Sequence, residues 1–195
     1  MALFKSKKHH WELTELVEAC QKQDSRAQVA FYDRYKSKLL GVCLRYARTV
    51  AEAEDIFQEG ILKIFTKIKD IQNPQTIDSW VKTIMIRHAI DYYNQVTRKE
   101  TLSSNLEDSK MDWESGDHLT LPGKLDVNVL LETINELPDG YRIVINLHFV
   151  DGYKHSEIAD LLGIKEASSR SQLSKGRNLL IKKLEQKGIT QHELL

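Results

Sequence analysis

The sequence predicts an all-α protein made of two small helical domains joined by an acidic, flexible linker. Apolar residues recur at helical spacing towards both ends of the 195-residue chain, and no segment shows the strict alternation of a half-buried strand. Residues 100–124 are instead rich in Ser, Asp, Glu and Gly and lack a sustained apolar repeat, which is typical of a linker. We place the domains at 8–98 and 127–188 and the linker at 99–126.

The first domain contains four amphipathic segments, and the turn sequences RTV and DIQNPQ separate the later ones. They predict helices at 12–23, 24–46, 51–69 and 77–98. The second domain contains four more, in which Pro138 suits a first helical turn because its missing N–H would have no partner there. They predict helices at 127–136, 138–150, 156–162 and 166–186.

Composition and apolar content limit the classes of protein to which this chain can belong. Hydrophobic residues make up 41% and charged residues 29%, as in an ordinary soluble helical protein. Cys20 and Cys43 form no CxxC pair and are expected to be buried, reduced thiols. The amino terminus has no apolar signal region and no apolar run approaches the ~18 residues of a membrane span, so we expect a cytoplasmic protein without membrane insertion.

Charge is distributed unevenly along a chain whose net charge is zero. Residues 1–100 carry 17 basic and 13 acidic side chains, residues 101–136 carry 2 and 8, and residues 137–195 carry 9 and 7. Between positions 165 and 183 there are six basic residues against Glu166 alone. Because a solvated helix normally interleaves both signs, this segment predicts an anionic partner.

The stretch HSEIADLLGIKEASSRSQLSKGR, residues 155–177, has the order short helix, glycine turn, long helix. Ser156 can cap the short helix, and Gly163 supplies the left-handed conformation that ends it. In the long helix, an inward stripe includes small Gly176, which allows close helix approach, and Ser169, which is a poor apolar member. The order is that of a helix-turn-helix, whose second helix enters the major groove of DNA.

The outward face of this second helix is small, polar and basic. Arginine and lysine can reach guanine acceptors, and serine lets the backbone approach. The candidate base contacts are Arg170, Ser171, Ser174 and Lys175. The candidate phosphate contacts are Arg177, Lys182 and Lys183. A solvated basic surface helix is the alternative, and the pattern alone does not decide between the two.

A second unusual segment is AEAEDIFQEGILKIF, residues 51–65. Asp55, Gln58 and Glu59 fall on one helical face, separate from a buried apolar stripe. The helix dipole favours acidic residues in a first turn. Gln58 and Glu59 lie deeper in the helix and require another explanation.

The segment DSWVKTIMIRHAIDYYNQVTRK mixes aromatic and basic side chains, as single-stranded DNA-binding surfaces do. The candidates are Trp80, Lys82, Arg87, Tyr92 and Arg98. Core packing is the alternative, because Trp80 and Ile84 form an i, i+4 pair. Arg87, His88 and Asp91 are close in sequence, but no second ligand or nucleophile has a suitable spacing. We therefore expect no catalytic site, no metal and no cofactor.

With these residues in view, the chain resembles the extracytoplasmic-function (ECF) subfamily of bacterial RNA polymerase sigma factors over nearly its whole length. AEDIFQEGILKIF is similar to that family's acidic helix DAEDxxQExFLxxW, and SWVKTIMIRHAIDYY is similar to WLxxIxxNxAxDxxR. LPDGYRIVINLHFVDGYKHSEIADLLGIKEASSRSQLSKGR is similar to LPxxxRxVxxLxxxxGxSxxEIAxxLGxSxGTVKSRLxRAR. The order and spacing of the three stretches together make the resemblance specific.

The resemblance implies that the first domain is sigma region 2, a helical bundle, and the second is sigma region 4, with the helix-turn-helix. It implies that Asp55, Gln58 and Glu59 dock on the β′ clamp helices of core RNA polymerase, with the β flap as a further contact. The aromatic and basic candidates would recognise and help melt the minus-10 promoter element. The base-contact candidates of the helix-turn-helix would read the minus-35 element.

The chain departs from the family pattern at four positions. Arg87 stands where the pattern has Asn, so that base contact is not carried over. Lys165 replaces the usual Ser or Thr cap of the recognition helix, which costs about 1 kcal/mol of helix stability. Ser169 and Gln172 replace Val and Arg, and Ser169 is expected to loosen the core.

The function expected from this resemblance is that of an alternative sigma factor, which directs promoter-specific transcription initiation without catalysing bond formation itself. Family members are commonly held inactive by an anti-sigma factor, so such a partner is also a candidate. One alternative is an autonomous helix-turn-helix regulator, which would leave AEDIFQEG unexplained. The other is a helical enzyme centred on Arg87, His88 and Asp91.

Overall fold

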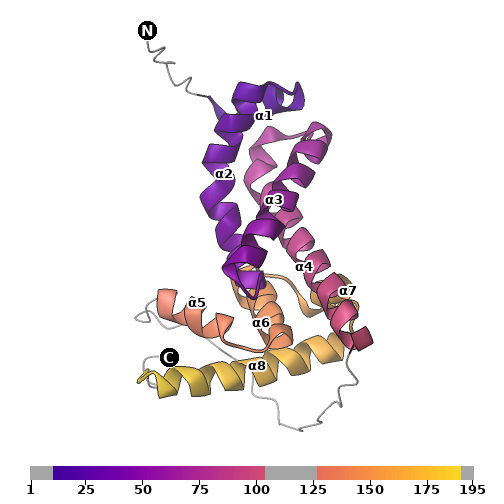
Figure 1. The fold of residues 1–195 in the computed structure, drawn as a ribbon. Helices are drawn as coiled ribbons and strands as arrows, with labels where there is room; N and C mark the ends of the chain where they lie inside the picture. Colours follow the sequence, from indigo (N-terminus) through magenta and orange to yellow (C-terminus); the bar gives the residue numbers. More distant parts are fainter. Residues whose placement is uncertain (1–10, 104–126, 190–195) are drawn as a thin grey trace.

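The computed structural model describes residues 11–103 and 127–189, with side chains described for 11–96 and 129–189. All regular structure within these ranges is helical (Figure 1), which confirms the predicted all-α class. The N-terminal half contains α1 (Leu13–Gln21), α2 (Ser25–Tyr46), α3 (Val50–Lys67) and α4 (Ile77–Ser103). Within the described ranges, no helix combines the length and apolar character needed to cross a membrane.

The C-terminal half places a long helix across the base of the molecule (Figure 1). Its helices are α5 (Val127–Asn135), α6 (Asp139–Ile145), α7 (His155–Leu162) and α8 (Glu166–Gln186). A π-helical turn, Asn146–Val150, extends α6. All eight predicted helices are present, but α4 continues through residues 99–103, the first part of the expected linker. The rest of that linker lies outside the described residues.

Local hydrogen bonds explain where several helices begin and end. The Asp24 carboxylate accepts from the backbone N–H of Arg26 at 2.8 Å and caps α2. The Arg26 guanidinium, which donates to the same carboxylate at 3.2 Å, and the backbone N–H of Arg26 lower the pKa of Asp24. Gly163 ends α7 at φ +66°, as the glycine pattern predicted. The predicted Ser156 cap is wrong, because α7 begins one residue earlier and the Glu157 carboxylate accepts from the Lys154 N–H at 2.8 Å.

The N-terminal core forms where α2, α3 and α4 pack against one another. Phe31 and Tyr35 of α2 are fully buried there, with ring centroids 4.6 Å apart. Cys20 and Cys43 are buried and free, which confirms the predicted reduced thiols. Burial raises the pKa of the Cys20 thiol to about 11 and that of Cys43 to about 12.

The two halves share an apolar cluster. The C-terminal residues Ile143, Val144, Leu147 and Ile158 are at most 1% exposed and belong to the same buried cluster as the N-terminal core. A second cluster joins α5, α6 and α8. The expected domains therefore lie against each other in the free chain.

Candidate nucleic-acid and partner interfaces

Helices α7 and α8 form the predicted helix-turn-helix. After Gly163, the N–H of Ile164 donates to the Ala159 carbonyl at 3.1 Å, and this turns the chain into α8. α7 then packs against α8. A short helix, a left-handed turn and a long helix have the geometry that presents the second helix to a DNA groove.

The inward stripe of α8 is buried, and its polar member has a partner. Ser169 is 0% exposed, and its Oγ lies 2.9 Å from Nδ1 of His155, the first residue of α7. Because the buried hydroxyl has a partner, it avoids most of the desolvation cost. The expectation that Ser169 loosens the core stays a prediction. The His155 ring also stacks on His148 at 4.6 Å. Sequence reasoning missed both histidines. His155 is the first residue of α7, and it reaches α8 through Ser169.

The outward face of α8 carries the predicted base contacts. Arg170 has a side chain 64% exposed and pairs with Glu166 one turn earlier. Ser171 is exposed, and Ser174 and Lys175 are half-buried. The face is thus partly accessible and basic, and its arginine forms an exposed intrahelical ion pair.

The predicted phosphate contacts lie further along α8. Lys182 is exposed, whereas Arg177 and Lys183 are half-buried. Lys183 and Lys187 both reach the Glu136 carboxylate, at 3.1 and 2.6 Å. These two lysines lower the pKa of Glu136 and attach the end of α8 to α5.

The start of α8 lacks a side-chain cap. Lys165 occupies the N-cap position and makes no side-chain cap hydrogen bond, so the expected missing cap is confirmed. We predict that Lys165→Ser stabilises the protein by about 1 kcal/mol, because a serine hydroxyl accepts a free N–H of the first turn. The measurement is urea unfolding followed by circular dichroism, with Lys182→Ser as the control. An equal effect of both changes would contradict capping as the cause.

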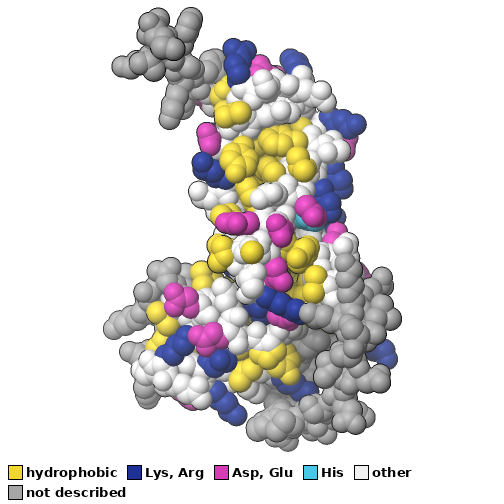
Figure 2. All heavy atoms as spheres, in the orientation of Figure 1, with side chains coloured by type: hydrophobic (Ala, Val, Ile, Leu, Met, Phe, Trp, Pro, Cys, Tyr) yellow, Lys and Arg dark blue, Asp and Glu magenta, His cyan; other side chains and the backbone are white. Residues whose placement is uncertain are grey.

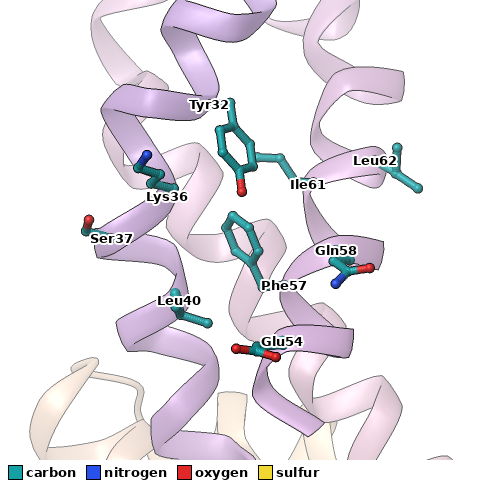
Figure 3. Close-up of a pocket in the computed structure, with 9 residues that line it drawn as sticks. All are labelled: Tyr32, Lys36, Ser37, Leu40, Glu54, Phe57, Gln58, Ile61 and Leu62. Atoms are coloured by element: carbon teal, nitrogen blue, oxygen red, sulfur yellow. The ribbon is translucent and has the colours of Figure 1, made fainter. Parts of the chain in front are cut away.

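A groove of about 650 Å³ lies between α2 and α3 (Figure 3). Its lining residues are Tyr32, Lys36, Ser37, Leu40, Glu54, Phe57, Gln58, Ile61 and Leu62. The rings of Tyr32 and Phe57 are neighbours within it, tilted by 60° to each other with centroids 5.7 Å apart. On the molecular surface, hydrophobic side chains gather on this part of the bundle and acidic side chains lie below them (Figure 2).

The predicted polar face of α3 borders this groove. Asp55, Gln58 and Glu59 are all exposed, and Gln58 also lines the groove. Glu59 Oε2 lies 3.4 Å from Nε2 of the buried His88, while the Nδ1 of that ring lies 2.7 Å from Lys63 Nζ. Burial and the charge of Lys63 lower the pKa of His88. Both of these polar partners of His88, Glu59 and Lys63, therefore belong to α3.

The predicted aromatic and basic residues of α4 have different environments. Trp80 is half-buried and packs against the core, and Arg87 is exposed. Tyr92 is half-buried, and burial and nearby carboxylates on α3 raise its pKa. Lys82 is ion-paired at 2.8 Å with Asp151 of the other half of the chain, a partner that the sequence did not indicate. Arg98 lies in α4, but its side chain is outside the described residues.

The residues that could bind a metal do not converge in the described part of the chain. Within residues 11–103 and 127–189, no group of three or more His, Cys, Asp or Glu side chains is placed to hold a metal ion. Two surfaces stand out among the described residues: the groove between α2 and α3 with its acidic border, and the basic helix α8.

Comparison with known proteins matches both halves of the chain. Residues 31–99 match the family described as Sigma-70 region 2, and residues 128–180 match Sigma-70, region 4. The chain is 23% identical over 179 residues to an ECF RNA polymerase sigma-E factor of Haemophilus influenzae, covering 87% of this chain and 94% of that protein. It is 29% identical over 149 residues to the sigma factor SigV of Bacillus subtilis, covering 75% and 84%.

A helical bundle that matches Sigma-70 region 2, followed by a helix-turn-helix that matches Sigma-70 region 4, defines a DNA-binding protein of transcription initiation. The chain belongs to the ECF subfamily of sigma-70 family RNA polymerase sigma factors. A solved structure of the sigma factor RpoE with the anti-sigma factor NepR, from Bartonella quintana, is 20% identical and covers 80% of this chain and 97% of that one, with a TM-score of 0.48.

Proposed function

We propose that this chain binds core RNA polymerase and directs promoter-specific initiation of transcription by recognising minus-35 and minus-10 elements. The observation that carries this function is the presence of two matched regions in one chain: a region 2 bundle bearing the α2–α3 groove, and a region 4 helix-turn-helix. An autonomous regulator would need only the region 4 helix-turn-helix. The proposed domains remain those of the sequence, 8–98 and 127–188, joined through 99–126.

The α2–α3 groove and its polar border are the proposed contact with the β′ clamp helices of the polymerase. Tyr32 and Leu62 are 40% and 66% exposed, so a partner helix can cover apolar area there. Asp55, Gln58 and Glu59 lie on exposed positions of α3, where they can pair with basic and polar groups. An apolar groove with a charged rim supports a helix docked into it. The β flap is the proposed partner of region 4.

The outward face of α8 is the proposed minus-35 contact. Arg170, Ser171, Ser174 and Lys175 lie on its accessible side, and Arg177, Lys182 and Lys183 are proposed to meet phosphates. The proposed minus-10 residues lie on α4: Trp80, Lys82, Arg87, Tyr92 and Arg98. Aromatic and basic side chains on one helix suit unpaired bases and their backbone.

The protein is proposed to act in the cytoplasm, where core polymerase and promoter DNA are found, and to catalyse no reaction of its own. Its role is to add promoter contacts to an enzyme that lacks them. Because the net charge is zero, few phosphates are neutralised at once, and binding to DNA without polymerase is expected to be weak. The polymerase joins both contacts in one complex. An anti-sigma factor is a further proposed partner.

The test is run-off transcription by purified core polymerase from DNA upstream of the protein's own coding sequence, with and without the chain. Specific initiation only when the chain is added is the expected result. Binding of the chain to duplex DNA with no effect on polymerase would instead support the autonomous helix-turn-helix regulator.

The proposed role of Arg170 predicts a loss of discrimination rather than a uniform loss of affinity. Arg170→Ala should cost about 1 to 3 kcal/mol between matched and mismatched minus-35 sequences, since a bidentate base contact is worth that much. The assay compares transcription from both promoters, with the exposed Arg26→Ala as the control. An equal loss on both promoters would make Arg170 a phosphate contact.

A further inference from the structure

His88 is a buried ionisable side chain to which the proposed function assigns no role. It lies in α4, is 4% exposed, and faces α3, where Glu59 and Lys63 are one turn apart. Among residues 11–96 and 129–189, Nε2 of this ring is buried and has no hydrogen-bond partner. A buried polar atom without a partner costs folding free energy, so its position calls for an explanation.

Gly60 lets the His88 ring lie against α3. It is buried and lies between Glu59 and Lys63 in the same helix. A Cβ on this residue would lie 2.5 Å from Met85 Sδ and 3.2 Å from His88 Cδ2, the carbon bonded to Nε2. A side chain here would displace Met85 and the imidazole. Glycine therefore keeps the ring at a place where each of its nitrogens has one polar neighbour on α3.

Lys63 determines which nitrogen of the ring carries the proton. A lysine ammonium has three donors and no acceptor. Its Nζ lies 2.7 Å from Nδ1, so Nδ1 accepts, and the proton of the neutral ring is on Nε2. Burial and the charge of Lys63 lower the pKa of His88, whereas the carboxylates of Glu59 and Asp91 act in the opposite direction. The ring is therefore neutral at pH 7, with an Nε2–H donor.

This donor faces the carboxylate of Glu59. Glu59 Oε2 is 3.4 Å from Nε2, beyond the ~2.9 Å of an ordinary N–H···O bond, and the Glu59 side chain is 64% exposed. The ring is fixed by packing, but the exposed carboxylate can move through its side-chain torsions. A small rotation of Glu59 gives the buried N–H its partner. Because the acceptor is charged, the resulting hydrogen bond is of the stronger kind.

We propose that His88 is a positioning residue for the polymerase contact: its Nε2–H holds the Glu59 carboxylate in the orientation that core polymerase binds, and Lys63 holds the ring in the tautomer that can do so. The inference rests on the proposed function, since Glu59 is a proposed polymerase contact. Docking must immobilise a flexible side chain, which costs free energy. A glutamate that a buried donor already orients loses less freedom, so His88 strengthens docking without lying on the docking surface.

Two substitutions of His88 separate positioning from packing. His88→Leu keeps an apolar side chain between α3 and α4 but has no donor, and it should weaken core polymerase binding about tenfold, or about 1.4 kcal/mol. His88→Gln keeps an N–H donor at a similar reach and should bind within about twofold of the parent. Equal losses of affinity in the two folded variants would overturn the inference.

A double-mutant cycle tests whether His88 acts through Glu59. Glu59→Ala removes the carboxylate that His88 is proposed to orient. Adding His88→Leu to Glu59→Ala should therefore cause no further loss of polymerase affinity. A further loss as large as the one that His88→Leu causes in the parent would show that His88 acts by another route, and would overturn the inference.

NMR of the imidazole nitrogens tests the contact without polymerase, with the His88 signals assigned by their absence from His88→Gln. At neutral pH the parent should show the Nε2–H tautomer, and Lys63→Met should populate both tautomers. Lys67→Met removes an exposed lysine one turn further along α3 and should leave the tautomer unchanged. Glu59→Ala should lower the pKa of His88, since a carboxylate favours the cation. An Nδ1–H tautomer in the parent, or no response to Glu59→Ala, would overturn the inference even if His88→Leu fails to fold.

The two kinds of measurement distinguish failure of this inference from failure of the proposed function. The expected tautomer, with polymerase binding by the parent and no effect of His88→Leu, would overturn positioning and leave the proposed function in place. The expected tautomer with no polymerase binding by any form would overturn the proposed function and positioning with it, and only the contact between His88 and Glu59 would remain.

Discussion

Replacing Glu59 with lysine should abolish binding to core polymerase while leaving the fold intact. Glu59 lies on the exposed face of α3, and its side chain is 64% exposed, so a lysine can extend into solvent. Placing a cation where the proposed partner surface expects an anion costs several kcal/mol. We expect Kd to rise by at least about 100-fold, or about 3 kcal/mol. The measurement is co-purification with core polymerase followed by titration.

A matched change away from this face provides the control. Glu18 is an exposed glutamate of α1, and Glu18→Lys makes the same change in net charge. It should bind polymerase as the parent does, and both variants should keep the parent's circular dichroism. Unchanged co-purification of Glu59→Lys would show that α3 docks elsewhere or not at all.

Gly176→Val should destabilise the helix-turn-helix more than any other single change considered for region 4. A Cβ at Gly176 would lie 2.9 Å from Tyr141 Cβ and 3.0 Å from Ile145 Cδ1, so α6 and α8 must separate to admit it. Overpacking of a close-packed core costs about 1 to 3 kcal/mol, and valine adds two more methyl groups to the clash. We expect about 3 kcal/mol, which lowers Tm by about 6–12 °C in a protein of this size.

Gly41 also lies inside a helix, but replacing it is expected to have the opposite effect on stability. It lies inside α2, and a Cβ there would meet nothing within 4 Å. Gly41→Ala should therefore stabilise by about 1 kcal/mol, because alanine has the higher helix propensity. Thermal unfolding of both variants tests the pair. Equal and small shifts would contradict the close α6–α8 contact as the reason for glycine at 176.

Local patterns in the sequence predicted most of the fold. The eight helices follow from apolar residues at a 3.6-residue period, which is a property of short segments and needs no knowledge of their partners. The left-handed end of α7 at Gly163, the uncapped Lys165 and the close approach at Gly176 follow from residue type and position alone. The Ser156 cap failed because Glu157, one residue later, made the competing hydrogen bond from a helix that starts at His155.

The sequence by itself therefore determined the helices, the helix-turn-helix and the exposed faces of α3 and α8. Only the tertiary structure decided which polar groups meet. His155 satisfies Ser169 from 14 residues away, and Arg45 reaches Asp151 across 106 residues. Such pairs depend on how whole helices pack, and no local period encodes them. The packing of the two halves against each other is the largest consequence, because it buries the Asp151 carboxylate between two predicted helices.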